Sequence, residues 1–212
     1  MTTKQPKKRT QASFVRTLSP TEAAYLAGVI DSDGAIIAQI KQNVGGGYVM
    51  LHQLSVTLQV TQKTKRRVIF LQHIVDLIGE GNLRDRLAEL EDDVDVTTLY
   101  ENQLSEPPDG SKKVVPVSDF YITKRESIAA VLTQIKPYLV VKKEQAVLVE
   151  QIITALKDNQ STKDPALFIP ICRLVDRVAL LNDSKNKTTS TNTVIETLKV
   201  LPKFANIKWD TL

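Results

Sequence analysis

Two aspartates near residue 30 are the strongest candidates for chemistry in this sequence. Asp31 and Asp33 follow a short apolar run in the segment Leu26–Gly34, so both fall at the C-terminal end of an expected helix. Ala27 and Gly28 give that helix a small packing face, which would let a second copy approach almost backbone to backbone. Carboxylates gathered there repel each other and oppose the helix dipole. A divalent cation would relieve both effects. With only two histidines and one cysteine in the chain, a hard ion such as Mg²⁺ is favoured.

A calcium loop is an alternative interpretation of the pattern Asp-Ser-Asp-Gly. An EF-hand loop needs glycine at its sixth position and glutamate at its twelfth. Counted from Asp31, the chain has Gly34 at the fourth position and Gln42 at the twelfth, so the spacing excludes this site. An apolar helix followed by a glycine turn, with no catalytic role, remains the other alternative at this point.

The helix that carries the aspartates has clear start and stop signals. Ser19 is a good N-cap, Pro20 suits the first helical position, and Glu22 places an acid in the first turn. We therefore expect a helix from about Pro20 to Ile30 that ends at the residues following it.

A long antiparallel hairpin is expected after this helix. Residues 36–43 and 54–60 alternate apolar and polar side chains with a period of two, and the three glycines 45–47 lie between them. Each strand therefore has one face for the core and one polar face. Residues 81–86 and 117–122 predict a third and a fourth strand.

The polar side of these strands carries side chains suited to binding nucleic-acid bases. Gln, Asn, Lys and Arg make paired hydrogen bonds to purine edges in the major groove, whereas a merely solvated face would contain more Glu and Thr. A ten-residue strand extends ~33 Å, about the length of 10 base pairs, so one subunit would bind one half-site. The candidate DNA-binding residues are Ile37, Gln39, Lys41, Asn43, Gln53, Gln59, Arg84, Arg86, Asp119 and Tyr121.

Apolar residues at helical spacing predict the helices that cover the other face. Residues 66–78 and 125–135 show this spacing, which gives the order αββαββα and an α+β fold. Further helices are expected at about 143–157 and 171–181, the second starting late because Pro170 interrupts it. His73 falls between apolar positions and is expected to be a partly exposed helix residue rather than a ligand.

One domain is the simplest organisation for 212 residues, because no linker rich in Pro, Gly or Ser divides the chain. We expect a basic flexible tail over residues 1–18, the folded domain over 19–200, and a C-terminal tail over 201–212. No apolar run approaches the ~20 residues of a membrane span. The single Cys172 has no disulfide partner, which fits a reducing, intracellular compartment.

The chain holds only one acid-tipped helix and no internal repeat of it. A symmetrical metal site at the helix tip would therefore need a second chain, in a closed C2 dimer. We place Tyr25, Ala27, Gly28 and Asp31 at this expected dimer interface.

The net charge of +4 is unevenly distributed along the sequence. Residues 87–113 contain eight acids and two lysines, a balance of −6, which leaves +10 for the rest of the chain. The basic remainder suits a polyanion, which would repel the acidic stretch. Because the stretch also contains the turn signal Pro107–Gly110, we expect a loop there, placed away from the phosphates.

The segment Leu26–Gly34 resembles the LAGLIDADG motif of homing endonucleases, with Val29 and Ser32 as mild variants at two of the nine positions. Further blocks are similar to the single-motif, homodimeric branch encoded in organellar ribosomal-RNA introns, and the likeness spans about Thr21 to Leu198. These blocks are Ile36–Lys41, His52–Arg67, Arg84–Arg86, Gln134–Leu139 and Leu181–Lys185. Compared with this family, residues 88–114 look like an acidic insertion between two strands.

The resemblance implies a LAGLIDADG fold with a saddle of antiparallel, DNA-binding strands and additional C-terminal helices. It implies a site-specific endonuclease that makes a metal-dependent double-strand break in a long, near-palindromic target and leaves 3′-hydroxyl ends. The implied target is an intronless rRNA gene, the implied result is intron mobility, and the implied location is an organelle, either chloroplast or mitochondrion.

The metal site is also implied by the resemblance. Asp33 would bind the ion together with its copy from the second subunit, and Ser32 would add its backbone carbonyl. Asp31 is better interpreted as structural, because it would bond backbone groups near the helix end. Mg²⁺ is the expected ion, Mn²⁺ is expected to substitute for it, and Ca²⁺ is expected to support binding without cleavage.

The same resemblance assigns the remaining site residues. Gln62 would orient water as a catalytic residue, and Arg66 and Lys142 would stabilise phosphate charge. Lys185 and Lys187, in a polar loop, would contact phosphates. Arg66 and Lys142 could instead contribute DNA affinity alone.

Two other functions remain open on the sequence. The same fold could serve as a maturase that binds its own intron RNA, or as a DNA-binding regulator that does not cleave. The joint presence of Asp33, Gln62, Arg66 and Lys142 favours the nuclease, because a pure binder has no need of a metal-binding carboxylate at its interface.

Overall fold

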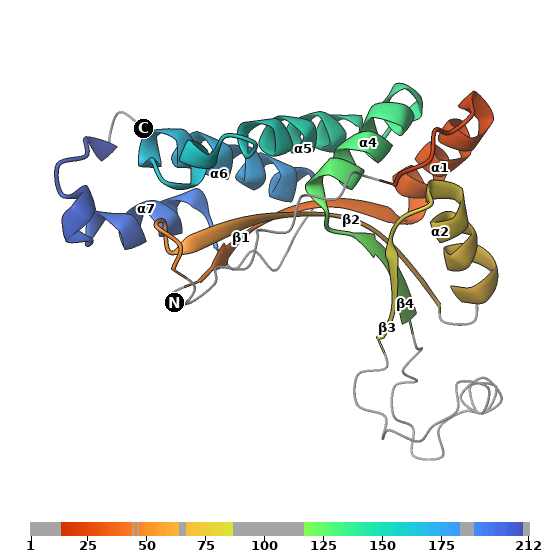
Figure 1. Cartoon of the computed structure of the whole chain (residues 1–212), viewed down its shortest axis with the longest axis horizontal. Coiled ribbons are helices and arrows are strands. Elements are labelled where there is room, and N and C mark those ends of the chain that lie inside the picture. The colour runs from red at the N-terminus through yellow and green to blue at the C-terminus, as the bar shows by residue number, and fades with distance from the viewer. Residues whose placement is uncertain are drawn as a thin grey trace, which may run out of the picture.

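Four antiparallel strands form the sheet that organises the molecule (Figure 1). They are β1 (Gly34–Gln42), β2 (His52–Lys63), β3 (Asn82–Arg86) and β4 (Val117–Ile122), in the spatial order β1-β2-β4-β3. The computed structural model describes residues 14–43, 45, 47–63, 67–86, 117–182 and 189–209. The predicted insertion 88–114 lies outside these residues.

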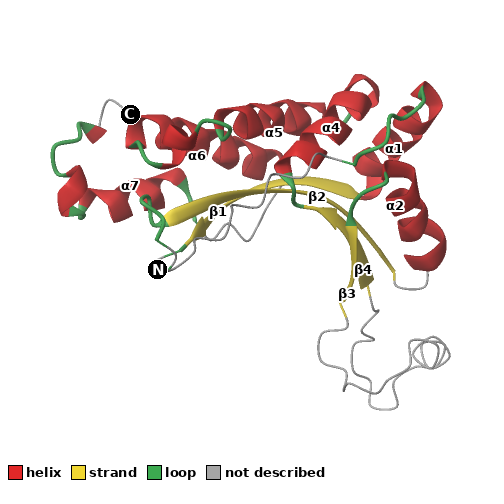
Figure 2. Cartoon of the chain, viewed as in Figure 1, coloured by secondary structure: helices red, strands yellow, loops and turns green. Residues whose placement is uncertain are grey.

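The helices confirm the predicted order αββαββα and extend it at the C-terminus. α1, α4, α5 and α6 pack on one face of the sheet, and the opposite, concave face carries none of these four helices (Figure 2). A π-helical turn, Arg67–Leu71, leads into α2. The helices are α1 (Pro20–Asp33), α2 (Gln72–Ile78), α4 (Arg125–Ile135), α5 (Lys143–Ala155), α6 (Pro165–Leu181) and α7 (Thr191–Lys199).

The predicted alternation of the hairpin is confirmed. Ile36, Ala38 and Ile40 of β1 are buried, as is every second residue of β2 from Leu54 to Val60. Their neighbours face the side without those helices. Each fully buried Leu or Ile contributes about 1.5–3 kcal/mol to folding, so a register slip of one residue would cost most of this stabilisation.

The start of α1 matches the sequence signals, but its end does not. Ser19 and Glu22 form a reciprocal capping box, with Pro20 at the first helical position. The helix runs on to Asp33 rather than stopping near Ile30, because its backbone bonds continue up to the N–H of the cap residue. Both motif aspartates therefore lie within its last turn.

The prediction that α6 starts after Pro170 is wrong. Asp164 caps the helix by accepting a hydrogen bond from the Ala166 N–H at 2.8 Å, and Pro165 occupies the first position. Pro170 lies inside the helix, where it removes the hydrogen bond to the Ala166 carbonyl. Ala166 and Pro170 are both exposed, so water can satisfy that carbonyl and the helix continues.

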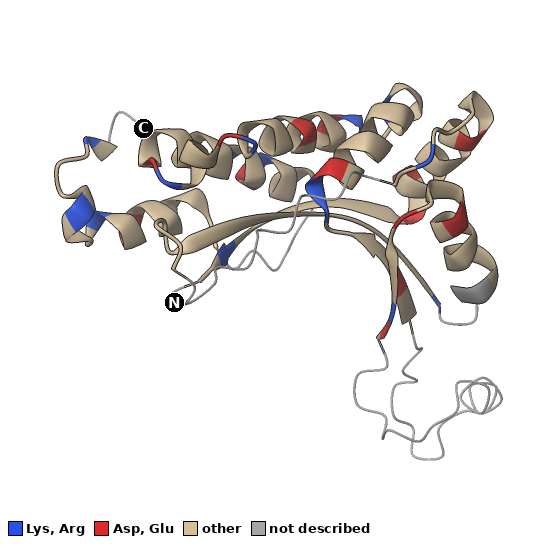
Figure 3. Ribbon diagram, viewed as in Figure 1, with Lys and Arg blue, Asp and Glu red and all other residues tan. Residues whose placement is uncertain are grey.

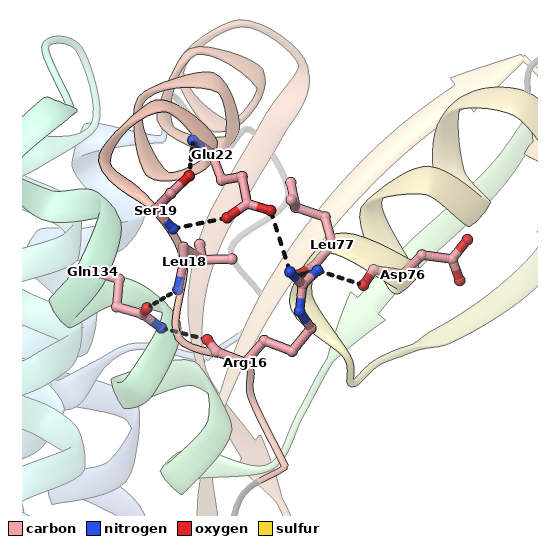
Figure 4. Close-up of polar contacts among 7 residues, drawn as sticks. All are labelled: Arg16, Leu18, Ser19, Glu22, Asp76, Leu77 and Gln134. Atoms are coloured by element: carbon pink, nitrogen blue, oxygen red, sulfur yellow. Dashed lines mark hydrogen bonds and ion pairs between the residues drawn. The ribbon is translucent and has the colours of Figure 1, made fainter.

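The segment before α1 is folded onto two neighbouring helices. The Arg16 guanidinium donates to carbonyls near the end of α2, 3.0 Å from that of Leu77 (Figure 4). Gln134 of α4 accepts from the Leu18 N–H at 2.7 Å and donates to the Arg16 carbonyl at 3.1 Å. The predicted tail to residue 18 is therefore wrong for residues 14–18, because α2 and α4 supply their polar partners.

Residues 201–209, expected to form a tail, are also packed. Phe204 is only 6% exposed, and Trp209 packs against the core.

Cys172 is buried as predicted, and burial raises the pKa of its thiol. His73 is exposed on α2, as expected, where its ring packs edge-on against Tyr25. None of the described helices is long and apolar enough to span a membrane.

Candidate active site

The last residue of α1 places a carboxylate beside the C-terminal end of β2. Asp33 is exposed, and Gln62 donates its side-chain N–H to Asp33 Oδ2 at 2.6 Å. Gln62 stands near the end of β2, so this bond joins the helix tip to the strand. Two predicted catalytic residues, separated by 29 positions in the chain, thus lie in direct contact.

Asp31 has the structural role that the sequence suggested. Its carboxylate accepts the backbone N–H groups of Val140 at 2.7 Å and Lys142 at 2.8 Å, just before α5. Burial raises its pKa, but the N–H groups of Val140, Lys142 and Val141 and the charge of Lys142 outweigh it, and the pKa is lowered. Lys142 in turn donates its ammonium group to the Asp31 carbonyl. Asp31 thus fixes the approach of α5 to the tip of α1.

Replacing Asp31 should destabilise the fold in a pH-dependent way. Because its pKa is lowered on folding, the ionised carboxylate stabilises the fold above its ordinary pKa of 3.8, and this stabilisation is lost as pH falls through the lower folded value. We expect Asp31→Asn to lower Tm by ~2–4 °C at pH 7, for a loss of about 1 kcal/mol. The difference in Tm from the unaltered protein should shrink as pH falls below 3.8; a difference that stayed constant over that range would contradict the assignment.

Gly34 is required by the sharp passage from α1 into β1. A Cβ atom at this position would lie 2.7 Å from the Ile30 Cα and 2.9 Å from its carbonyl oxygen, so backbone would have to shift. The Gly34 N–H instead donates to the Val29 carbonyl and caps the helix. The final glycine of the motif is therefore explained by close approach, and it sets the position of Asp33 beside the sheet.

The donors near Asp33 suit a hard cation but are incomplete in one chain. Asp31 is engaged by backbone N–H groups, which leaves Asp33 as the exposed carboxylate of the helix tip. The Ser32 hydroxyl donates to the Val29 carbonyl at 3.3 Å, so the backbone carbonyl of Ser32 is its available oxygen donor. Within the described part of the chain, no three His, Cys, Asp or Glu residues gather into a metal site. Oxygen ligands from a second copy would complete such a site.

One face of α1 is exposed and carries two small residues beside a tyrosine. Ala24, Tyr25 and Gly28 lie on it, and nothing lies within 4 Å of the position that a Gly28 Cβ would occupy. The prediction that Ala27 contacts a partner is wrong, because Ala27 is fully buried in its own core. Ala24, four residues before Gly28, was the missed member of this face, and the helical spacing would have identified it.

The polar face of the hairpin carries six of the twelve predicted DNA-binding residues. Gln39 lies opposite Ser55, and Lys41 opposite Gln53, in the β1–β2 register. Ile37 in β1 and Asn43, just after it, have the same alternation as Gln39 and Lys41 and so point to the same face. β1 and β2 carry basic residues but no acidic ones (Figure 3).

A buried carboxylate organises the part of the sheet face that β2, β4 and β3 form. Asp119 is fully buried and accepts hydrogen bonds from Gln59 at 2.9 Å, Thr61 at 2.7 Å and Arg84 at 2.8 Å. The Arg84 guanidinium also stacks 5.4 Å from the centre of the Tyr121 ring. The prediction that Asp119 contacts DNA is wrong, because these side chains cover it. It holds Gln59 and Arg84 instead, and Thr61 was missed because a threonine on a strand face is a common residue.

Several predicted site residues cannot be placed. Arg66, Lys185 and Lys187 lie outside the described residues, and Arg86 ends β3 with its side chain likewise outside them. Their roles stay predictions.

Comparison with known proteins decides the family. The chain is 41% identical over 170 residues to DNA endonuclease I-CreI of Chlamydomonas reinhardtii, covering 80% of this chain and 84% of that protein. It is 34% identical over 178 residues to DNA endonuclease I-CvuI of Chlorella vulgaris, covering 84% and 90%. The chain belongs to the LAGLIDADG homing endonucleases. No protein-family model matches it.

Solved structures of this family agree with that assignment. I-CvuI in complex with its target, in the presence of calcium, matches with a TM-score of 0.66 and 31% identity, over 89% of this chain and 97% of that one. I-CeuI complexed with DNA matches with a TM-score of 0.60 at 11% identity and covers 85% and 77%, which supports the fold alone. The predicted family, α+β fold and activity as a site-specific DNA endonuclease are confirmed.

Proposed function

We propose that two copies of this chain form a homodimer that makes a Mg²⁺-dependent double-strand break in a long, near-palindromic DNA target. The observation that carries the proposal is the exposed Asp33 at the inner end of a polar sheet face, next to the exposed face of α1 that carries Ala24 and Gly28. One chain offers half of a cutting site and half of a binding surface. A second copy of the chain, related to the first by a twofold axis along α1, would supply the other halves.

The mechanism assigns distinct tasks to the residues at the tip of α1. Asp33 and the Ser32 carbonyl would hold the ion, which supplies charge neutralisation and a water of lowered pKa. Gln62, already bonded to Asp33, orients water near the scissile phosphate. Lys142 and Arg66 stabilise the negative charge that develops on the phosphate oxygens. The products would carry 3′-hydroxyl ends.

The polar face of the sheet would then recognise the base sequence of the DNA target. β1 begins directly after Asp33, so the strand runs outward from the cut, and its nine residues cover ~30 Å, or about nine base pairs. Gln39, Lys41 and Gln53 would face outer base pairs, whereas Gln59 and Arg84 lie nearer the centre. Lys185 and Lys187 would contact phosphates.

We further propose an intronless rRNA gene in a chloroplast or mitochondrion as the target, with intron mobility as the outcome. This rests on the resemblance to the branch encoded in organellar ribosomal-RNA introns. A second role as a maturase on intron RNA stays a candidate, because the polar sheet face suits either polyanion.

Cleavage of a duplex target in different metals tests the proposal. Mg²⁺ and Mn²⁺ should each support cutting of both strands, and Ca²⁺ should support specific binding without cutting. Cleavage that persisted in a chelator would contradict a metal mechanism. Specific binding to intron RNA with no cutting of any DNA would favour the maturase.

Arg84→Ala should change which sequences are cut. Because Arg84 is held by Asp119 with its side chain 56% exposed, its loss should weaken discrimination at a few positions of each half-site by ~1–3 kcal/mol. Lys185→Ala, as a control, should weaken binding to all DNA sequences alike. It should also lower the slope of the logarithm of the binding constant against the logarithm of salt concentration by about one. Cleavage rates on single-base variants of the target provide the measurement. Uniform weakening by Arg84→Ala would remove this residue from the base-reading set.

A further inference from the structure

Residues 47–51, the described end of the turn between β1 and β2, are held in one conformation by local contacts. Leu51 has φ of 52°, a left-handed conformation that costs a leucine about 1 kcal/mol or more. It is kept there by hydrogen bonds to Asn43 at 2.8 Å and to Tyr48 at 3.0 Å. Met50 is 1% exposed, and buried His52 bonds its carbonyl at 2.8 Å. Such a turn persists only where its surroundings fix it.

The C-terminal segment supplies part of those surroundings. The Lys203 ammonium donates to the Val49 carbonyl at 2.6 Å, which joins residues 154 positions apart. Phe204, one residue later, is 6% exposed, and Trp209 packs edge-on against its ring at 6.4 Å. Figure 1 shows α7, which leads into this segment, beside the same end of the sheet. Residues 201–209 thus anchor themselves in the core and reach out to the turn.

We propose that residues 201–209 act as a clamp that positions the β1–β2 turn for recognition of the outermost base pairs of each half-site. The inference rests on the proposed reading of DNA by this hairpin. Because β1 runs outward from Asp33, the turn lies at the end of the sheet farthest from the cut. Asn43 follows β1 directly, and its backbone N–H is bonded within the turn, so a displaced turn would displace it. The clamp is a positioning element and does not itself contact the reacting atoms.

The consequence for recognition differs from a general loss of stability. A loosened turn would let the outer side chains sample several positions, which lowers the difference between right and wrong bases there. The inner positions near Asp33 and Gln62, and the cutting step itself, would be unaffected.

The test uses the full-length protein with Lys203→Ala and Phe204→Ala together, and with Lys203→Ala and Phe204→Leu singly as milder variants. Cleavage is measured on targets changed at each half-site position. We expect discrimination at the outermost two or three positions to fall by about 5-fold or more, from the usual cost of a mismatch. Inner positions and the single-turnover rate on the original target should stay unchanged.

The matched control is Lys199→Ala with Val200→Ala. It removes the same charge and a neighbouring apolar side chain, but Lys199 pairs with Glu196 and Val200 is 79% exposed. If the clamp variants match this control, or weaken all positions equally, the clamp is refuted. Gln53→Ala separates the clamp from the proposed DNA recognition by the hairpin. If Gln53→Ala leaves the base preference unchanged, recognition by the hairpin is refuted as well. If Gln53→Ala alters preference and the clamp variants do not, only the clamp fails.

Discussion

Asp33→Asn is expected to reduce DNA cleavage in Mg²⁺ by about 1000-fold or more, which corresponds to roughly 4 kcal/mol of lost transition-state stabilisation. The asparagine has nearly the same shape, and its oxygen can still accept the 2.6 Å bond from Gln62. Only the negative charge that would hold the ion is removed. Specific DNA binding in Ca²⁺ should stay within a few-fold, because binding is spread over the sheet.

Asp76→Asn, at an exposed aspartate of α2, is the control and should leave the cleavage rate unchanged. Single-turnover rates and binding isotherms on the same target separate the two effects. If Asp33→Asn weakened binding as severely as cutting, Asp33 would be structural rather than a metal ligand.

Gly28→Leu is expected to abolish cleavage by preventing dimerisation. Within one chain the new side chain meets open space, and replacing glycine inside a helix favours folding by up to about 1 kcal/mol. The monomer should therefore fold as well as before or better. Only a second helix packed on this face would be obstructed.

Sedimentation and thermal melts should thus show a stable monomer that does not cut. Ala166→Leu, at an exposed alanine on α6, serves as the control and should leave the assembly and activity unaltered. An active Gly28→Leu monomer would refute the twofold site.

The secondary structure was predictable wherever a local pattern determined it. The alternation in β1 and β2 and the capping signals at Ser19 gave the hairpin and the start of α1, since both depend on neighbouring residues. The end of α1 and the start of α6 were misplaced. α1 runs on because its backbone hydrogen bonds continue to the Gly34 N–H. α6 starts early because Asp164 caps it, and Pro170 is tolerated inside because water reaches the carbonyl that it leaves unpaired.

The site was predictable in its membership but not in its contacts. Asp33 came from the motif and Gln62 from the wider family resemblance, and the structure brings them together. The burial of Ala27 depends on which side of α1 meets the core, and two adjacent small residues do not reveal that side. Asp119 lies on the predicted polar strand face, yet Gln59, Thr61 and Arg84 cover it. Such a network across three strands follows from register, which the sequence of one strand does not contain.

Selection of cleaved sites from a randomised duplex library tests the central claim most directly. The account predicts near-palindromic sites of about 20 base pairs, two half-sites of about ten each, cut on both strands only when Mg²⁺ or Mn²⁺ is present. Recovery of asymmetric sites of half that length, or of duplexes nicked on one strand, would contradict a homodimer that joins two copies of Asp33 at one cutting site.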